Sequence, residues 1–245
     1  MLYQINLHAH TRYSDGAGTI EIMARECKKL GFSACVITDH VYSQDADYSL
    51  NMEKWTDQII EAAEVSYRLE YPIIIGCEFS IQQYEEVLVF GSKAIHELLS
   101  LRDKRTKLGV NPTIQIQDLR RVRERYDCAT ILCHPCLASY DNKPNFIEAG
   151  GVEILDGYEY YNSGEVGFDK TREVPIEFKD LTPFSNSDAH NPMTLEWNYN
   201  EVERCIMDEV QLIQYIKSKK PVTLVNNCRV NDPLLGRGPW KYGDS

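Results

Sequence analysis

The sequence predicts an α/β protein whose mostly parallel sheet closes into a barrel or near-barrel. Short apolar segments typical of buried strands alternate with amphipathic helical segments, which is the pattern of successive βαβ units. Five of the six histidines lie at the ends of such strand segments. In barrels of this kind, side chains from separate strands meet at the carboxyl ends of the strands, where the chemistry is assembled.

The first element is a strand that begins near Tyr3. Apolar and polar residues alternate with a period of two, with Leu7 and Ala9 on one face and His8 and His10 on the other. Residues two apart on a strand project the same way, about 7 Å apart, so both imidazoles could converge on one ion or a close pair of ions. Two neighbouring histidines can also be a solvated strand end, and the rest of the chain has to decide.

Helices and strands then alternate. A helix is expected over 19–30, with Thr19 as its N-cap and Gly31 as its stop, followed by a buried strand over 34–38 that ends in Asp39 and His40. A long helix over 51–70 leads into an apolar strand over 72–77, which Glu78 closes. Three strand segments in a row therefore end in a residue type that binds metals.

The same alternation continues to the end of the chain. The remaining expected elements are a strand over 86–91, a short helix over 95–101, a polar connection over 103–111, a helix over 117–126, strands over 130–133, 156–162 and 184–187, a strand over 202–206, a helix over 209–219, a strand over 222–225 and a tail with glycine and proline. His134 follows the strand over 130–133, and Asp188 and His190 follow the strand over 184–187. Residues 163–180 show no clear pattern.

Length and composition favour one cytoplasmic domain. The 245 residues, 43% of them hydrophobic, can build one large α/β core. No apolar run approaches the ~20 residues that span a bilayer, and the chain starts without a signal-peptide pattern, so we expect no membrane association. The eight cysteines lie mostly in apolar segments, which is typical of reduced thiols. The single CxxC over 133–136 lacks the second pair of a zinc ribbon, and a redox pair stays a minor alternative.

The formal net charge of −11 limits the partners. Proteins that follow a long phosphate backbone usually carry a basic stripe, and none is evident, so we do not expect binding to a long nucleic-acid tract. A small phosphorylated substrate or short oligonucleotide remains compatible, because divalent cations reverse the local field.

The strand ends offer imidazoles and carboxylates to a common rim, and we expect them to bind metal. This set comprises His8, His10, His40, Glu78, His134, Asp188 and His190. Such ligands suit Zn²⁺, Mn²⁺ or Fe²⁺ better than the all-oxygen cages of Mg²⁺ or Ca²⁺. His96, inside an amphipathic helix, has the ordinary interpretation of a surface or half-buried side chain.

These motifs, in this order, resemble those of the PHP (polymerase and histidinol phosphatase) family. The motifs are His8-x-His10 with Ser14-Asp15-Gly16, then Thr38-Asp39-His40, Gly76-x-Glu78, Cys133-His134-Pro135 and Ser187-Asp188-Ala189-His190. The resemblance spans about residues 1–190. It implies a distorted (β/α)7 TIM-like barrel forming a single domain over residues 1–245, in which 191–245 complete the barrel and the tail. It also implies up to three metal ions and phosphoester hydrolysis.

The resemblance also implies a role for each ligand. His8, His10, Glu78 and Asp188 would hold a first metal, Glu78 would bridge to a second that also uses His134, and Asp15, His40 and His190 would hold a third. The family commonly places a histidine at the start of the fourth strand, where this chain has Glu86 or Val87. Glu86 is therefore a candidate ligand, or it marks a looser site, or it is a solvent-facing residue beside Glu85.

Two metals about 3.5 to 4 Å apart would lower the pKa of a shared water, and the metal-bound hydroxide would be the nucleophile. The third metal or a nearby cation would neutralise charge on the leaving group. Arg12 is a candidate phosphate contact, with a surface arginine as the alternative; Lys143 and Arg237 are weaker candidates. Some tyrosines could stack on a base, although packing is their commoner role: Tyr13, Tyr158, Tyr160 and Tyr161.

The sequence thus predicts a hydrolase of phosphoric esters with two or three divalent ions (Zn, Mn or Fe). Its substrate would be a small phosphomonoester, nucleotide or short oligonucleotide. The Ser14-Asp15-Gly16 form resembles the nucleotidase and exonuclease-like branch more than the histidinol phosphatase branch, which stays an alternative. A non-catalytic metal-binding scaffold and an amidohydrolase are further alternatives, because similar barrels serve different chemistry. The sequence does not define the oligomeric state.

Overall fold

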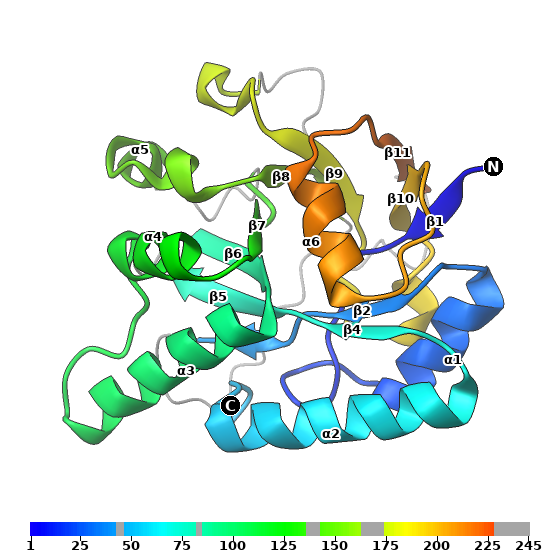
Figure 1. The fold of residues 1–245 in the computed structure, drawn as a ribbon, viewed down its shortest axis with the longest axis horizontal. Helices are drawn as coiled ribbons and strands as arrows, with labels where there is room; N and C mark the ends of the chain where they lie inside the picture. The colour runs from blue at the N-terminus through cyan, green and yellow to red at the C-terminus, as the bar shows by residue number, and fades with distance from the viewer. Residues whose placement is uncertain (43–46, 82–84, 136–142, 163–173, 228–245) are drawn as a thin grey trace, which may run out of the picture.

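The chain forms a mixed α/β fold, seen in a computed structural model that describes residues 1–42, 47–81, 85–135, 143–162 and 174–227 (Figure 1). The described helices are α1 (Ile20–Leu30), α2 (Met52–Leu69), α3 (Ser92–Lys107), α4 (Ile116–Arg125), α5 (Lys143–Glu148) and α6 (Glu209–Lys217). Short 3₁₀ helices cover Gly151–Ile154, Ile176–Phe178 and Pro192–Thr194. In Figure 1, α1 to α5 border the strands along the lower and left sides, and α6 lies over the strands.

The described strands form three hydrogen-bonded sheets. The largest has the order β3-β5-β6-β7-β8-β9, β2 pairs with β4, and β10 lies between β1 and β11. The strands are β1 (Tyr3–Ile5), β2 (Cys35–Ile37), β3 (His40–Val41), β4 (Ile73–Ile75), β5 (Cys77–Ile81), β6 (Glu85–Phe90), β7 (Ala129–Leu132), β8 (Gly157–Asn162), β9 (Thr182–Asn186), β10 (Asn198–Val202) and β11 (Thr223–Asn226).

The expectation of a mostly parallel sheet is wrong for the described strands. Pairs β2–β4, β3–β5, β7–β8 and β8–β9 are parallel, whereas β1–β10, β10–β11, β5–β6 and β6–β7 are antiparallel. Only residues 82–84 separate β5 from β6. A connection that short cannot make the crossover of a dozen or more residues that parallel strands need, so these two strands must be antiparallel.

The segment after β1 bridges the two outer strands of the largest sheet. The backbone N–H of His10 donates to the carbonyl of Ala189, just beyond β9, over 2.9 Å. The carbonyl of Ala9 accepts from the N–H of Thr38, just before β3, over 2.8 Å. His8 and His10 therefore lie in an extended segment between β9 and β3, and not within one long strand from Tyr3 as predicted.

Local capping explains the helices whose bounds match the prediction. The Thr19 side chain accepts from the N–H of Ile22 at the start of α1, and Gly31 ends α1 with a φ of 81°. The Asn51 side chain accepts from the N–H of Lys54 at the start of α2. α4, α6 and the strands β2, β6, β7, β8, β9 and β11 also lie within a few residues of their predicted bounds.

Two predicted elements differ because distant partners decide them. α3 runs for 16 residues through the stretch over 103–107 that was expected to be irregular. Its buried Arg102 donates to the carbonyl of Tyr42 over 3.1 Å, and Arg105 contacts the carboxylate of Asp118 at 2.8 Å. A strand was predicted over 202–206, but β10 covers Asn198–Val202, because these residues pair with β1 and β11. α5 was not predicted, and residues 163–173 lie outside the described residues.

The core consists of three apolar clusters. One lies between α3, α4 and strands β5 to β7, a second between α6 and strands β1, β6 and β7, and a third between α1, α2 and β2. Fully buried rings such as Phe79, Phe90 and Phe184 each contribute about 2–3 kcal/mol by leaving water. Gly76 allows close packing here, because a Cβ at this position would lie 2.7 Å from the ring of Phe90.

The six described cysteines are free thiols, as expected: Cys27, Cys35, Cys77, Cys128, Cys133 and Cys205. Cys136 and Cys228 lie outside the described residues. Among the described helices, none combines the length and apolar character that crossing a membrane requires.

Candidate metal centre

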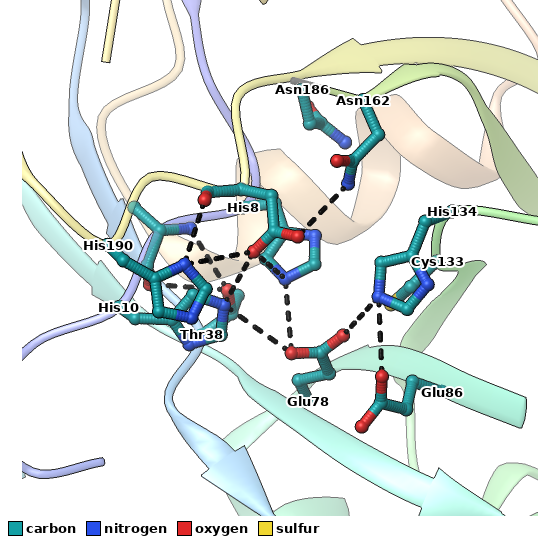
Figure 2. Close-up of polar contacts among 12 residues, drawn as sticks. His8, His10, Thr38, Glu78, Glu86, Cys133, His134, Asn162, Asn186 and His190 are labelled. Atoms are coloured by element: carbon teal, nitrogen blue, oxygen red, sulfur yellow. Dashed lines mark hydrogen bonds and ion pairs between the residues drawn. The ribbon is translucent and has the colours of Figure 1, made fainter. Parts of the chain in front are cut away.

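The structure places all nine predicted ligand side chains in one cluster. Figure 2 labels His8, His10, Glu78, Glu86, His134 and His190 of this cluster. They come from seven places in the chain: the segment after β1, the turn that follows it, β3, β5, β6 and the segments after β7 and β9. Glu78 lies within β5, not at a strand end as predicted, and pairs with His40 of β3. Glu86 of β6 pairs with Ser80, two residues from Glu78, so both carboxylates project from the same face.

A first group contains His8, His10 and Asp188, with Glu78 beside it. His8 Nε2 lies 3.1 Å from Glu78 Oε2, and His10 Nε2 lies 3.0 Å from Asp188 Oδ1. The side chains of His8, His10 and Glu78 have no exposed surface, whereas that of Asp188 is 16% exposed. This carboxylate therefore reaches the solvent side of an otherwise buried group.

A second group surrounds the other oxygen of Glu78. His134 Nε2 lies 3.2 Å from Glu78 Oε1 and 3.3 Å from Glu86 Oε2. Glu86 is buried inside the cluster and does not face solvent. Burial raises the pKa of the Glu86 carboxyl, and the charge of Glu78 raises it further.

A third group contains His10, Asp15, His40 and His190, whose ligand atoms lie within 4.8 Å of one another. His190 Nε2 lies 3.3 Å from Asp15 Oδ1, and His40 Nε2 lies 3.5 Å from the same oxygen. His40 Nδ1 also lies 2.8 Å from Glu78 Oε2, so the third group adjoins the other two.

Several buried polar atoms of the cluster have no hydrogen-bond partner among the described residues. They are His8 Nε2, His10 Nδ1, Asp15 Oδ1, His40 Nδ1 and Glu78 Oε2. Buried polar atoms are nearly always hydrogen-bonded, so five such atoms in one place need an explanation. Nitrogen and carboxylate oxygen atoms that face one another without hydrogen-bond alignment suit divalent cations, and the residues present therefore fit the implied metals.

A model of the PHP domain matches residues 6–167. The chain belongs to the PHP domain family. Members of this family are metal-dependent phosphoesterases. The match ends before Asp188 and His190, but the structure brings these two residues to the same cluster as the candidate ligands inside the matched region.

Solved structures share the fold of this PHP domain at low identity. A two-domain protein containing a predicted PHP-like metal-dependent phosphoesterase from Bacteroides vulgatus is 16% identical, with a TM-score of 0.64, over 92% of this chain and 65% of that one. PsfC from Pseudomonas syringae is 14% identical, with a TM-score of 0.62, over 92% and 91%. The lesion-specific endonuclease PfuEndoQ from Pyrococcus furiosus is 16% identical, with a TM-score of 0.60, over 91% and 58%. No curated protein matches the chain.

Buried groups of opposite charge face one another in the cluster of the nine candidate ligands. Burial lowers the pKa of the buried histidines, but Glu78 and its neighbours outweigh burial and raise the pKa of His40 to about 9 and of His134 to about 10. Burial and the charges of His40 and His190 instead lower the pKa of His10 to about 3. Although burial opposes it, the surrounding imidazoles hold the pKa of Glu78 and of Asp188 well below the usual range.

We expect the metal-free protein to lose stability as the pH rises from about 6.5 to 10. The folded pKa values of His40 and His134 lie above the unfolded value of 6.5, so their contribution is complete below 6.5 and is lost as the pH passes about 9 and 10. The midpoint of thermal unfolding, measured in the presence of a chelator across this pH range, checks that stability falls as the pH rises. With Mn²⁺ or Zn²⁺ added the decline should be smaller, because cations replace the protons. A midpoint that rises with pH in the chelator would contradict the charge assignment.

Two candidate ligands in this cluster have strained backbones. The φ angles of His134 and Asp188 are 26° and 50°, in the left-handed region that side chains other than glycine rarely adopt. Such conformations cost about 1–3 kcal/mol each and persist only where the surroundings fix them. They direct both side chains into the cluster, and no sequence pattern predicted these conformations.

Sequence reasoning missed the role of Asp39, whose carboxylate fixes the turn that carries Asp15. Asp39 is fully buried and accepts from the N–H and hydroxyl of Thr11 at 2.7 and 2.6 Å, from the Ser14 hydroxyl and from the Gln58 amide. Gly16 completes the turn, because a Cβ at Gly16 would lie 2.4 Å from the carbonyl oxygen of His10. An acid beside a predicted ligand was the only available signal.

It also missed Glu159, which lies in the middle of β8 and is 1% exposed. The signal was a charged residue within the aromatic run over 158–161. Tyr42 was missed as well; its ring stacks on His40, with ring centroids 4.5 Å apart and an interplanar angle of 21°.

The remaining candidates from the sequence are Arg12, four tyrosines, Lys143 and Arg237. Arg12 is exposed, and its Nε donates to the carbonyl of Ala17 over 3.0 Å, so its role as a phosphate contact stays a prediction. The hydroxyl of Tyr13 donates to Glu61 over 2.9 Å, and Tyr158 packs against Phe178. Tyr160 and Tyr161 contact each other edge to face. The Lys143 side chain and Arg237 lie outside the described residues.

Proposed function

We propose that this PHP domain is a metal-dependent phosphoesterase that hydrolyses a small phosphomonoester, nucleotide or short oligonucleotide. The observation that supports it most is the buried cluster in which five imidazoles and four carboxylates meet, several of them with unpartnered atoms. Such a set of ligands is costly to bury without cations, so a purely structural role would not account for it.

We assign three positions to two or three divalent ions (Zn²⁺, Mn²⁺ or Fe²⁺), following the family resemblance of the sequence motifs. The first would use His8, His10, Glu78 and Asp188; the second Glu78, Glu86 and His134; the third Asp15, His40 and His190. When bound, the ions would supply a nucleophile at neutral pH and stabilise negative charge on the phosphoryl group. Glu86 is included because it lies 3.3 Å from His134 Nε2 and is buried.

The protein's own side chains would hold the metal positions in place and contact the substrate. Glu78 touches His8 with one oxygen and His134 with the other, at 3.1 and 3.2 Å, and so would hold the first two positions in fixed relation. Asp188, partly exposed, marks the side from which a substrate would approach. Arg12, exposed in the turn that carries Asp15, would contact a phosphate of the substrate.

The finer description of the fold is also a proposal. We infer a distorted (β/α)7 TIM-like barrel in a single domain over residues 1–245. It is supported by the backbone contacts of Ala9 and His10 with Thr38 and Ala189, which link the two outer strands of the six-stranded sheet. The cytoplasmic location likewise remains a prediction.

The substrate class rests on charge and on the neighbours. PfuEndoQ is a lesion-specific endonuclease, and a related structure holds endonuclease Q with a 27-mer duplex, but this chain spans only 58% of each. The net charge of −11 does not favour a long phosphate backbone, so a nucleotide or short oligonucleotide is the better match. A histidinol-phosphatase-like activity is the alternative within the same chemistry.

The test is a panel of substrates assayed with added Mn²⁺ or Zn²⁺: histidinol phosphate, 3′,5′-bisphosphonucleotides, short RNA, amides and lactones. We expect turnover of at least one phosphoester and its loss with a chelator. The double variant His8→Ala, Asp188→Asn should remove it; unchanged activity in that variant would assign the turnover to a contaminant and favour a non-catalytic scaffold. Turnover of amides or lactones alone would favour the alternative that this chain is an amidohydrolase. An amidohydrolase from Chromobacterium violaceum shares the fold of this chain, with a TM-score of 0.53 at 14% identity.

A further inference from the structure

We propose that Glu159 is a positioning residue shared by the first and second metal positions, and that it couples them. This inference rests on the metal binding assumed in the proposed function. Glu159 belongs to none of the predicted ligands. It lies on β8, on the opposite side of His8 and His134 from Glu78, and its side chain has no exposed surface.

One oxygen of Glu159 orients His8. Oε1 lies 2.8 Å from His8 Nδ1 and accepts from the Asn186 amide over 2.9 Å. With Nδ1 held as the donor, the other ring nitrogen of His8, which has no hydrogen-bond partner, would be free to bind a metal ion in the cluster. Carboxylates that accept from a metal-binding imidazole fix its tautomer and its ring orientation in this way.

The other oxygen holds the backbone of His134. Oε2 accepts from the N–H of His134 over 2.8 Å and from the Asn162 amide over 2.8 Å. This N–H belongs to the residue with the strained φ of 26°, so the hydrogen bond helps to maintain a conformation that would otherwise relax. In that conformation His134 Nε2 reaches both Glu78 and Glu86.

Glu159 lies with His8 and Cys133 in a group whose ligand atoms are within 4.8 Å of one another, but its hydrogen bonds favour a supporting role over direct binding of an ion. A carboxylate offers about four lone-pair sites, and His8, Asn186, the His134 backbone and Asn162 supply four donors, two for each oxygen. Four donors would occupy those sites. The Asn162 amide also lies 3.4 Å from Asp188 Oδ2, which extends the support to a further ligand of the first position.

The coupling makes a specific prediction. Loss of His8 should weaken mainly the first position, and loss of His134 mainly the second, but Glu159→Gln should weaken both. In the glutamine variant an amide group replaces one acceptor oxygen and faces donors. Removing such a supporting partner lowers metal affinity by about 10–100-fold.

The experiment is titration of the full chain with Zn²⁺ in competition with a chromogenic chelator. The variants His8→Ala and His134→Ala identify which binding step belongs to the first metal position and which to the second. Glu153→Gln is the matched control, since Glu153 is exposed and contacts Arg120 at the surface. We expect both steps to shift in Glu159→Gln and neither in Glu153→Gln. Thermal unfolding of the metal-free variants separates the effects, because a purely structural role would lower the midpoint and leave the zinc affinity of the folded protein unchanged.

Wild-type affinity at either position in folded Glu159→Gln would overturn the proposal. If that variant does not fold, Glu159→Asp keeps the charge but draws back both oxygens, and a shift of both steps is again expected; wild-type affinity would again overturn it. A wild-type protein that binds no Zn²⁺ would overturn it too. A wild-type protein that binds zinc with this coupling but hydrolyses no phosphoester would refute only the proposed function.

Discussion

Replacing Glu78 with glutamine is expected to reduce phosphoester hydrolysis by a factor of about 10³. The two oxygens of Glu78 lie 2.8 Å from His40 Nδ1 and 3.2 Å from His134 Nε2, and the first is also 3.1 Å from His8 Nε2. An amide keeps the volume but removes the charge and one acceptor, so the shared ligand between the first two positions is lost. Metal-assisted stabilisation is worth several kcal/mol, which corresponds to about a thousand-fold in rate.

The measurement is kcat/KM on whichever phosphoester the panel identifies, together with the metal content of the purified variant. Both should fall. Glu64→Gln is the matched control, because Glu64 is an exposed residue of α2. Wild-type metal content together with wild-type turnover in Glu78→Gln would contradict the proposed bridging role.

Asp39→Ala is expected to lower the free energy of unfolding by about 3–5 kcal/mol. The change leaves four buried donors, from Thr11, Ser14 and Gln58, without their acceptor. Each unsatisfied buried donor costs about 1–3 kcal/mol, although rotation of the two hydroxyls relieves part of the sum. The turn that carries Asp15 should also loosen, so the third metal position should weaken with it.

Urea unfolding of the metal-free protein checks this expectation, with Asp57→Ala, at an exposed position of α2, as the control. Asp39→Asn should be milder, because the side chain keeps an oxygen acceptor and because burial raises the pKa of the Asp39 carboxyl, which makes its charge costly. An unchanged midpoint in Asp39→Ala would show that the four donors find other partners.

The helices could be predicted because their signals are local. Thr19 and Gly31 act on residues of their own turn, and the structure finds them in the predicted roles. Strand pairing is not local, and so the antiparallel pairs of β5, β6 and β7 and the position of β10 were not foreseen. The second half of α3 was missed for the same reason, since the partner of Arg102 lies 60 residues away.

The convergence of the candidate ligands could be predicted from residue types at strand ends, but not the groups that support them. Glu159 and Asp39 each look like an isolated acid in the sequence, and only the fold shows that their partners come from distant segments. For Glu86 the sequence left three interpretations open: a ligand, the mark of a looser site, or a solvent-facing residue. The pairing of Glu86 with Ser80 places it beside Glu78 inside the cluster, which the solvent-facing interpretation does not predict.

The joining of residues 8–10 to residue 189 affects how the protein matures during translation. His8 and His10 leave the ribosome about 180 residues before Asp188 and His190. At synthesis rates of about 5–20 residues per second, this interval lasts on the order of ten seconds or more. During that time the nascent chain exposes an incomplete set of imidazoles, and a full complement of ligands forms only after the last of them has emerged.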